Sequence, residues 1–142
     1  MTKPDCLPKG WSVLKIDGFM TLIGPFLRSK DQDDATIYGL QTTAHHKNHL
    51  GIVHGGVLTA LLDQAIAITA WNAVDRQPTV TVQMDTRFMG AVKAGDFLEI
   101  HPVVDHVTRS LVFVSAQVVC NDVVIARASA VMKVSKQVEQ KS

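Results

Sequence analysis

The sequence predicts an α+β domain in which a long central helix is wrapped by a curved antiparallel β-sheet. Residues 56–72 contain no proline and many good helix formers, so we expect a helix there. Four later segments alternate apolar and polar side chains, which is typical of strands covered on one face. These segments are residues 79–89, 95–107, 110–120 and 124–134. A helix and a sheet that each carry apolar surface bury it by packing together.

Two segments before the helix complete the expected sheet. Residues 22–28 and 35–43 have the composition of strands, and residues 13–20 fit a short helix or an extended lead-in. The dipeptide Asn121-Asp122 is a turn signal that joins the last two strands. In the first strand after the helix, the alternation predicts Val80, Val82, Met84 and Phe88 on the covered face and Thr79, Thr81, Gln83, Asp85 and Arg87 on the other.

Composition limits the class of protein. The chain has 142 residues, which is the size of one domain, 1–142, with polar ends at about 1–9 and 136–142. Its 14 basic and 13 acidic residues nearly balance, which argues against nucleic-acid binding. No apolar stretch approaches the ~20 residues needed to span a membrane, and no signal-peptide core opens the chain. Two cysteines are too few for a disulfide framework. We therefore expect a cytoplasmic protein.

Asp63 is the one charged residue of the expected helix. The helix is otherwise apolar almost all round, which is typical of a buried helix. A carboxylate in such surroundings must be hydrogen-bonded, protonated or open to a cleft, because its desolvation is costly. A structural bridge between helices and a catalytic acid are both compatible with this position.

A glycine pair precedes this helix in the segment Asn48-His-Leu-Gly-Ile-Val-His54-Gly55-Gly56. Amide N–H groups at a helix start have no partner within the helix and lie at the positive end of its dipole. Such groups can hold a developing oxyanion. The alternative is a plain helix-entry turn, which His54 and Asn48 on the same segment make less favourable.

The spacing of Gly55 and Asp63 has a geometric consequence. Eight residues along a helix correspond to ~12 Å, so one substrate carbonyl cannot contact both groups. If both serve one reaction, they come from different subunits whose helices run antiparallel about a two-fold axis. A catalytic role therefore predicts a homodimer with two sites at its interface.

Other kinds of site are weakly supported. His45, His46, His49 and His54 lie close together in the sequence, but they lack the spacing and the carboxylate partner of a metal site, so we expect no metal. The sequence has no nucleophile elbow, phosphate-binding loop or dinucleotide-binding motif. We expect Cys120 to be a small apolar residue of a strand and not a nucleophile. Phosphate groups could meet cations from the set Arg87, Lys93, Arg109, Arg127 and Lys133.

The ordered set Asn48, Gly51, His54-Gly55-Gly56 and Asp63 resembles hotdog-fold acyl-CoA thioesterases of the phenylacetate-pathway (PaaI) type. The resemblance extends from about Gly24-Pro25 to Val134. It implies a hotdog fold that hydrolyses an acyl- or aryl-CoA thioester to the free acid and CoA. It also implies a homodimer or a dimer of dimers (a homotetramer), without metal or redox cofactor.

The same resemblance implies roles for individual residues. Asp63 acts on the thioester as general base for water or as nucleophile, and Gly55 donates its backbone N–H to the thioester oxygen. Asn48 holds the attacking water or the carbonyl, and His54 shapes the loop and helps to polarise the thioester. Gly56 and Thr81 are expected at the substrate, with the Thr81 hydroxyl placing the water. The alternation described above, however, turns Thr81 away from the helix.

Two other functions fit the same fold. A hotdog enoyl-CoA hydratase or dehydratase would need a histidine and a carboxylate placed to move a proton on carbon. A non-catalytic acyl-CoA-binding module would not need Asp63. Release of CoA from a panel of acyl-CoA thioesters separates both from a thioesterase.

Overall fold

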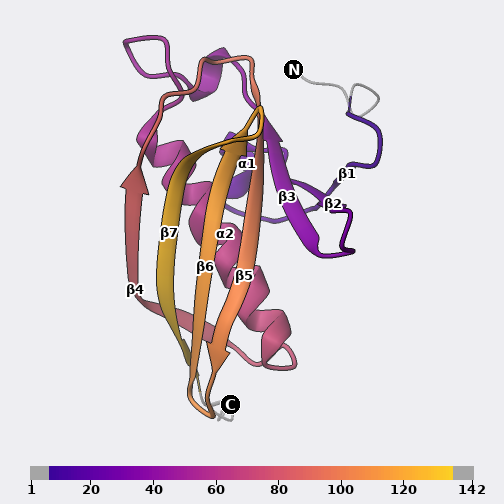
Figure 1. Ribbon diagram of the computed structural model, residues 1–142, viewed down its shortest axis with the longest axis vertical. Coiled ribbons are helices and arrows are strands. Elements are labelled where there is room, and N and C mark those ends of the chain that lie inside the picture. Colours follow the sequence, from indigo (N-terminus) through magenta and orange to yellow (C-terminus); the bar gives the residue numbers. More distant parts are fainter. Residues whose placement is uncertain (1–6, 136–142) are drawn as a thin grey trace.

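One long helix lies across one face of a single antiparallel sheet, as Figure 1 shows for the computed structural model, which describes residues 7–135. The sheet has seven strands in the order β1-β2-β3-β5-β6-β7-β4. The helices are α1 (Met20–Ile23) and α2 (Gly55–Ala73). The strands are β1 (Ser12–Val13), β2 (Leu27–Lys30), β3 (Thr36–Gln41), β4 (Thr79–Phe88), β5 (Phe97–Val107), β6 (Leu111–Cys120) and β7 (Val123–Val134). The predicted hotdog arrangement is confirmed.

The core lies between α2 and the concave face of the sheet. Leu58, Leu61, Leu62, Ala65 and Ile66 of α2 are buried there. They pack against every second residue of the long strands, and in β6 the buried and half-buried side chains alternate without exception. Period-two alternation over ten residues is what one covered face requires.

The structure corrects the expectation for residues 22–28. This stretch contains the end of α1, and β2 begins only at Leu27. Proline has no backbone N–H to donate to a strand ladder, so pairing with β3 starts after Pro25. The preceding lead-in contributes the two-residue strand β1, which pairs with β2.

A β-bulge in β4 corrects the expected orientation of Thr81. Thr81 pairs with Met132 of β7, whereas Gln83 pairs with the next residue, Val131, so one extra residue is inserted between them. A bulge reverses the alternation of the strand. Thr81 before the bulge and Met84 after it therefore both face α2, whereas Val80 is exposed.

Helix α2 is not buried on all sides. Asp63 is exposed, and a stripe of half-buried or exposed residues follows its side of the helix. The stripe consists of Thr59, Ala60, Asp63, Gln64, Ala67, Ile68 and Trp71. Several of these residues are small or apolar, which is why composition alone predicts a fully buried helix. No helix within residues 7–135 has the length and apolar character to cross a membrane.

Candidate active site

Asp63 lies at the middle of the open stripe of α2, facing the first half of β4. The hydroxyl of Thr81 donates to its Oδ1 at 3.5 Å, which is a long hydrogen bond. The Asp63 side chain is exposed within one chain, so the carboxylate is accessible from solvent. The sequence left open whether this carboxylate is buried and bridged or accessible, and the structure shows that it is accessible.

The start of α2 presents an amide that the chain itself does not use. His54 is the N-cap, and its Nδ1 accepts from the Gly56 N–H at 2.8 Å. The N–H groups of Val57 and Leu58 reach the His54 carbonyl at 2.9 and 3.3 Å. Within residues 7–135 the Gly55 N–H makes no hydrogen bond. Capping therefore leaves the first amide of the helix free for another acceptor.

The two glycines meet different restrictions. A Cβ on Gly56 would lie 3.0 Å from His54 Nδ1, so this position must stay small for the imidazole to cap the helix. A Cβ on Gly55 would meet the ring of Phe88 at 3.5 Å, which is ordinary contact. Phe88, at the end of β4, therefore lies beside Gly55.

Asn48 shapes the loop before α2. Its Oδ1 accepts from the Leu50 N–H at 2.8 Å and, more weakly, from the Ile52 N–H at 3.4 Å. Asparagine oxygens commonly stabilise turns in this way. Within the described chain its side-chain NH₂ group makes no hydrogen bond, so the donor end of the amide is the part that a ligand could use.

His46 supports the loop from inside the protein. Its Nδ1 accepts from the Thr43 N–H at 2.9 Å, so Nε2 carries the proton and donates to the Ile23 carbonyl at 2.5 Å. The His46 carbonyl in turn accepts from the His54 N–H at 2.8 Å. The buried His46 thus connects α1 to the N-cap of α2.

The remaining histidines of this segment, His45 and His49, are exposed. In the part of the chain that the structure describes, no three His, Cys, Asp or Glu side chains come together in a metal-binding group. Cys120 is buried, and this burial, followed by the charge of Asp96, raises the pKa of its thiol. A buried thiol with a raised pKa is a poor nucleophile.

Asp63 and Gly55 remain separated within one chain. Both belong to the uninterrupted helix α2, so their distance along its axis is ~12 Å, as the spacing predicts. The chain holds the acid with Thr81 at one place, and the free amide with Asn48, His54 and Phe88 at another.

An open groove of about 340 Å³ lies between the second half of α2 and the start of β4, beginning at Gln64, the residue after Asp63. Gln64, Ala67, Ile68, Trp71, Pro78 and Thr79 line it. The guanidinium of Arg76 lies 5.2 Å from the centre of the Trp71 ring, a distance typical of a cation–π contact. Leu58, Leu62 and Ile66 of α2 do not line this groove, because all three are buried in the core. The i, i+4, i+8 spacing of Asp63, Ala67 and Trp71 could have revealed it.

Two comparisons of sequence relate the chain to known proteins. The family model described as "Thioesterase superfamily" matches residues 50–126. A protein of Pseudomonas aeruginosa named "putative esterase" is 32% identical over 127 residues, which cover 88% of this chain and 95% of the relative.

The chain belongs to the thioesterase superfamily. Its fold is similar to that of zebrafish thioesterase superfamily member 2 (TM-score 0.68, 20% identity, covering 89% of this chain and 82% of that one). It is also similar to a mutant of the phenylacetic acid degradation protein PaaI of Thermus thermophilus (TM-score 0.65, 23% identity, covering 69% and 83%). A Streptococcus mutans protein solved with bound acetyl-CoA has a TM-score of 0.63 and 26% identity, covering 70% and 79%.

Replacement of His46 tests its structural role in this thioesterase-superfamily chain. His46→Ala removes the partners of the Thr43 N–H and the Ile23 carbonyl, so we expect the free energy of unfolding to fall by about 2 to 3 kcal/mol. Urea denaturation measures the loss. The exposed neighbour offers a matched control, since His45→Ala should change stability by no more than about 0.5 kcal/mol. Equal effects of the two substitutions would contradict the role of His46.

Proposed function

We propose that the protein is an acyl-CoA thioesterase that hydrolyses an acyl- or aryl-CoA thioester to the free acid and CoA, at sites on a homodimer interface. One observation carries the proposal: an accessible acid and an unused helix-start amide lie on one helix, too far apart to act on the same carbonyl. Membership of the thioesterase superfamily and the acetyl-CoA bound to the Streptococcus mutans relative support it.

The free edge of the sheet supports the dimer. β4 is the outermost strand beside β7, and an unpaired edge of ten residues is a ready surface for pairing with a second copy. Asp63 lies beside Thr81 near one end of β4, and Gly55 lies against Phe88 at the other end. Antiparallel pairing of two β4 strands about a two-fold axis near residues 84–85 would bring Asp63 toward Gly55 of the partner subunit.

The exposed stripe of α2 supports the same assembly. Its small residues Ala60 and Ala67 would let two antiparallel helices approach closely over the paired strands. Leu50 and Met89, apolar loop residues that are exposed within one chain, lie near the same end of the molecule as Gly55, so the same pairing would bring them toward the groove of the second copy. Burial of these surfaces would favour association.

The chemistry needs few groups. Asp63 accepts a proton from water, the hydroxide attacks the thioester carbon, and the carbonyl oxygen becomes an oxyanion that accepts the N–H of Gly55 of the partner subunit. The C–S bond then breaks, and the CoA thiolate leaves and takes up a proton. Alternatively, the Asp63 carboxylate attacks directly and water hydrolyses the resulting anhydride. In either route Thr81 orients the carboxylate or the water, and the free NH₂ group of Asn48 binds the water or the carbonyl.

The groove beside Asp63 is the proposed acyl site. Ala67 and Ile68 offer apolar surface next to the reacting carbon, and Trp71, held against Arg76, closes the far end. The axial distance from Asp63 to Trp71 is ~12 Å, which would favour aryl or medium-length acyl groups over long chains.

Removal of the acid tests the catalytic proposal. Asp63→Asn keeps the shape of the side chain but cannot accept a proton, so we expect kcat to fall by about 10²- to 10⁴-fold without loss of the folded dimer. A thiol reagent that detects released CoA measures the rate. Asp122→Asn is the matched control, because this exposed turn residue has a positive φ that asparagine also adopts, and it should keep full activity. Undiminished turnover by Asp63→Asn would refute the role of the acid.

Mixed dimers test the shared site. Gly55→Pro removes the proposed oxyanion donor while keeping a residue that fits the first helical position, and the extended backbone of His54 tolerates a following proline. Alone, this variant should lose about 10²- to 10³-fold in kcat. Refolded together with an equal amount of Asp63→Asn, it should recover roughly a quarter of native activity, because half the dimers then contain one intact site. No recovery, despite mixed dimers, would place both groups of a site in one chain.

Truncation at the end of the groove tests the acyl site. Trp71→Ala should move the optimum of kcat/KM toward longer straight-chain acyl-CoA substrates, because the groove then lacks its end. Trp71→Phe keeps an aromatic ring there and should leave the optimum nearly unchanged. A uniform change over the whole substrate series would argue against this assignment.

A further inference from the structure

We propose that Lys93 binds a phosphate group of the CoA substrate, and that the other basic residues singled out in the sequence do not. This inference rests on the proposed thioesterase function and deepens it by assigning the nucleotide end of the substrate. Lys93 is exposed, and within residues 7–135 it forms no ion pair.

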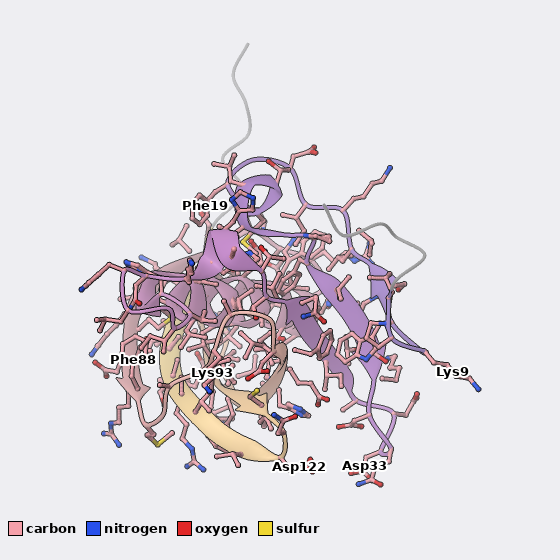
Figure 2. All side chains as sticks on the ribbon, turned by 90° about the horizontal axis from the view of Figure 1, so that it is seen from above. Lys9, Phe19, Asp33, Phe88, Lys93 and Asp122 are labelled. Atoms are coloured by element: carbon pink, nitrogen blue, oxygen red, sulfur yellow. The ribbon has the colours of Figure 1, made fainter. Side chains whose placement is uncertain are left out.

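Backbone pairing brings Lys93 to the loop that carries the candidate site. Ile52 pairs antiparallel with Lys93, and Lys47 pairs antiparallel with Val53, so three short segments lie side by side. The Val53 N–H donates to the Val92 carbonyl at 2.7 Å and fixes this arrangement. Figure 2 agrees, since Lys93 and Phe88 lie on the same side of the molecule, away from Lys9 and Asp33.

The pairing also decides which side chains share a face. Residues directly opposite in an antiparallel pair point to the same side, and neighbours along the chain point to opposite sides. Lys93 therefore shares its face with Ile52. Asn48, whose N–H donates to the Ile52 carbonyl at 2.7 Å, lies opposite Ile52 and belongs to that face too. Adjacent segments are ~4.8 Å apart, so Lys93 starts ~10 Å from Asn48.

Lys47 is turned the other way. It pairs with Val53, whose side chain is buried, so Lys47 leaves the loop from the face opposite to Lys93. Two lysines with similar exposure in the same short ribbon are therefore distinguished by orientation alone.

The remaining cations lie elsewhere in the fold. Arg87 pairs with Arg127, and Lys133 pairs with Val80, all on the face of the sheet away from α2. Arg109 lies in the turn between β5 and β6, at the end of β5 farthest from Lys93 (Figure 1). β5 has eleven residues, so its two ends are ~33 Å apart.

Charge at the loop favours an anion. The stretches 35–62 and 86–95 contain no aspartate or glutamate, and the start of α2 adds the positive end of a helix dipole. The closest acid in sequence, Asp96, is half-buried, and its N–H donates to the Lys93 carbonyl at 3.2 Å; it makes no ion pair with Lys93. If the CoA extends from the site across the face that carries Asn48, its phosphate groups come close to Lys93, a cation without an ion-pair partner among the described residues.

The test compares substrates with and without phosphates. Lys93→Ala should raise KM for an acyl-CoA about three- to tenfold with kcat nearly unchanged, and weaken the salt dependence of kcat/KM. With the acyl-pantetheine thioester, which carries no phosphate, native protein and Lys93→Ala should be equal. Lys93→Arg keeps the positive charge and should have a KM close to that of the native protein. Lys47→Ala and Arg127→Ala are the controls and should leave both substrates unaffected.

Several results would overturn the inference while the thioesterase proposal survives. These are turnover of acyl-CoA with an unchanged KM in Lys93→Ala, an equal loss with both substrates, or an equal effect of Lys47→Ala. Native protein that releases CoA from no thioester would instead reject the proposed function. Calorimetric titration with free CoA then still decides on Lys93, because the predicted three- to tenfold weakening in Lys93→Ala needs no turnover.

Discussion

The rigidity of α2 is the constraint on which the rest of the proposed site depends. An uninterrupted helix fixes the distance between Gly55 at its start and Asp63 in its third turn. No rotation of side chains can bring a backbone amide and a carboxylate together over ~12 Å on the same helix. Either these groups serve different purposes, or a second subunit completes each site. The accessible carboxylate and the unused amide favour the second explanation.

The free amide of Gly55 results from how the neighbouring groups are satisfied. A helix start has several N–H groups without helical partners, and His54 supplies acceptors for the next three through its ring and its carbonyl. His46 holds His54 in turn, and His46 is fixed by Thr43 and Ile23. Hydrogen bonds that are prepared in advance need no reorganisation when negative charge develops, which is why such donors are effective in acyl transfer.

Strand β4 combines two features that bear on the same site. Its bulge allows Thr81 before it and Met84 after it to face α2, so the Thr81 hydroxyl reaches Asp63. Its position at the edge of the sheet leaves a full side of backbone groups for a second copy. Edge strands that remain exposed are a liability for aggregation, so pairing within a closed dimer would remove this liability as well as complete the site.

The sequence by itself determined the class of fold, the extent of α2 to within a residue at each end, and which residues of β6 lie on its buried face. These features depend on local periodicity and composition, which are readable along the chain. The Asn48, His54-Gly55-Gly56 and Asp63 set was also readable, because its members are close in sequence.

Tertiary structure alone decided the orientation of Thr81, since a bulge arises from pairing with a distant strand. It also decided which face of α2 stays open, because a helix of apolar and small residues carries little signal of its own. The opposite orientations of Lys93 and Lys47 were also decided by tertiary structure, because they follow from the residue with which each lysine pairs.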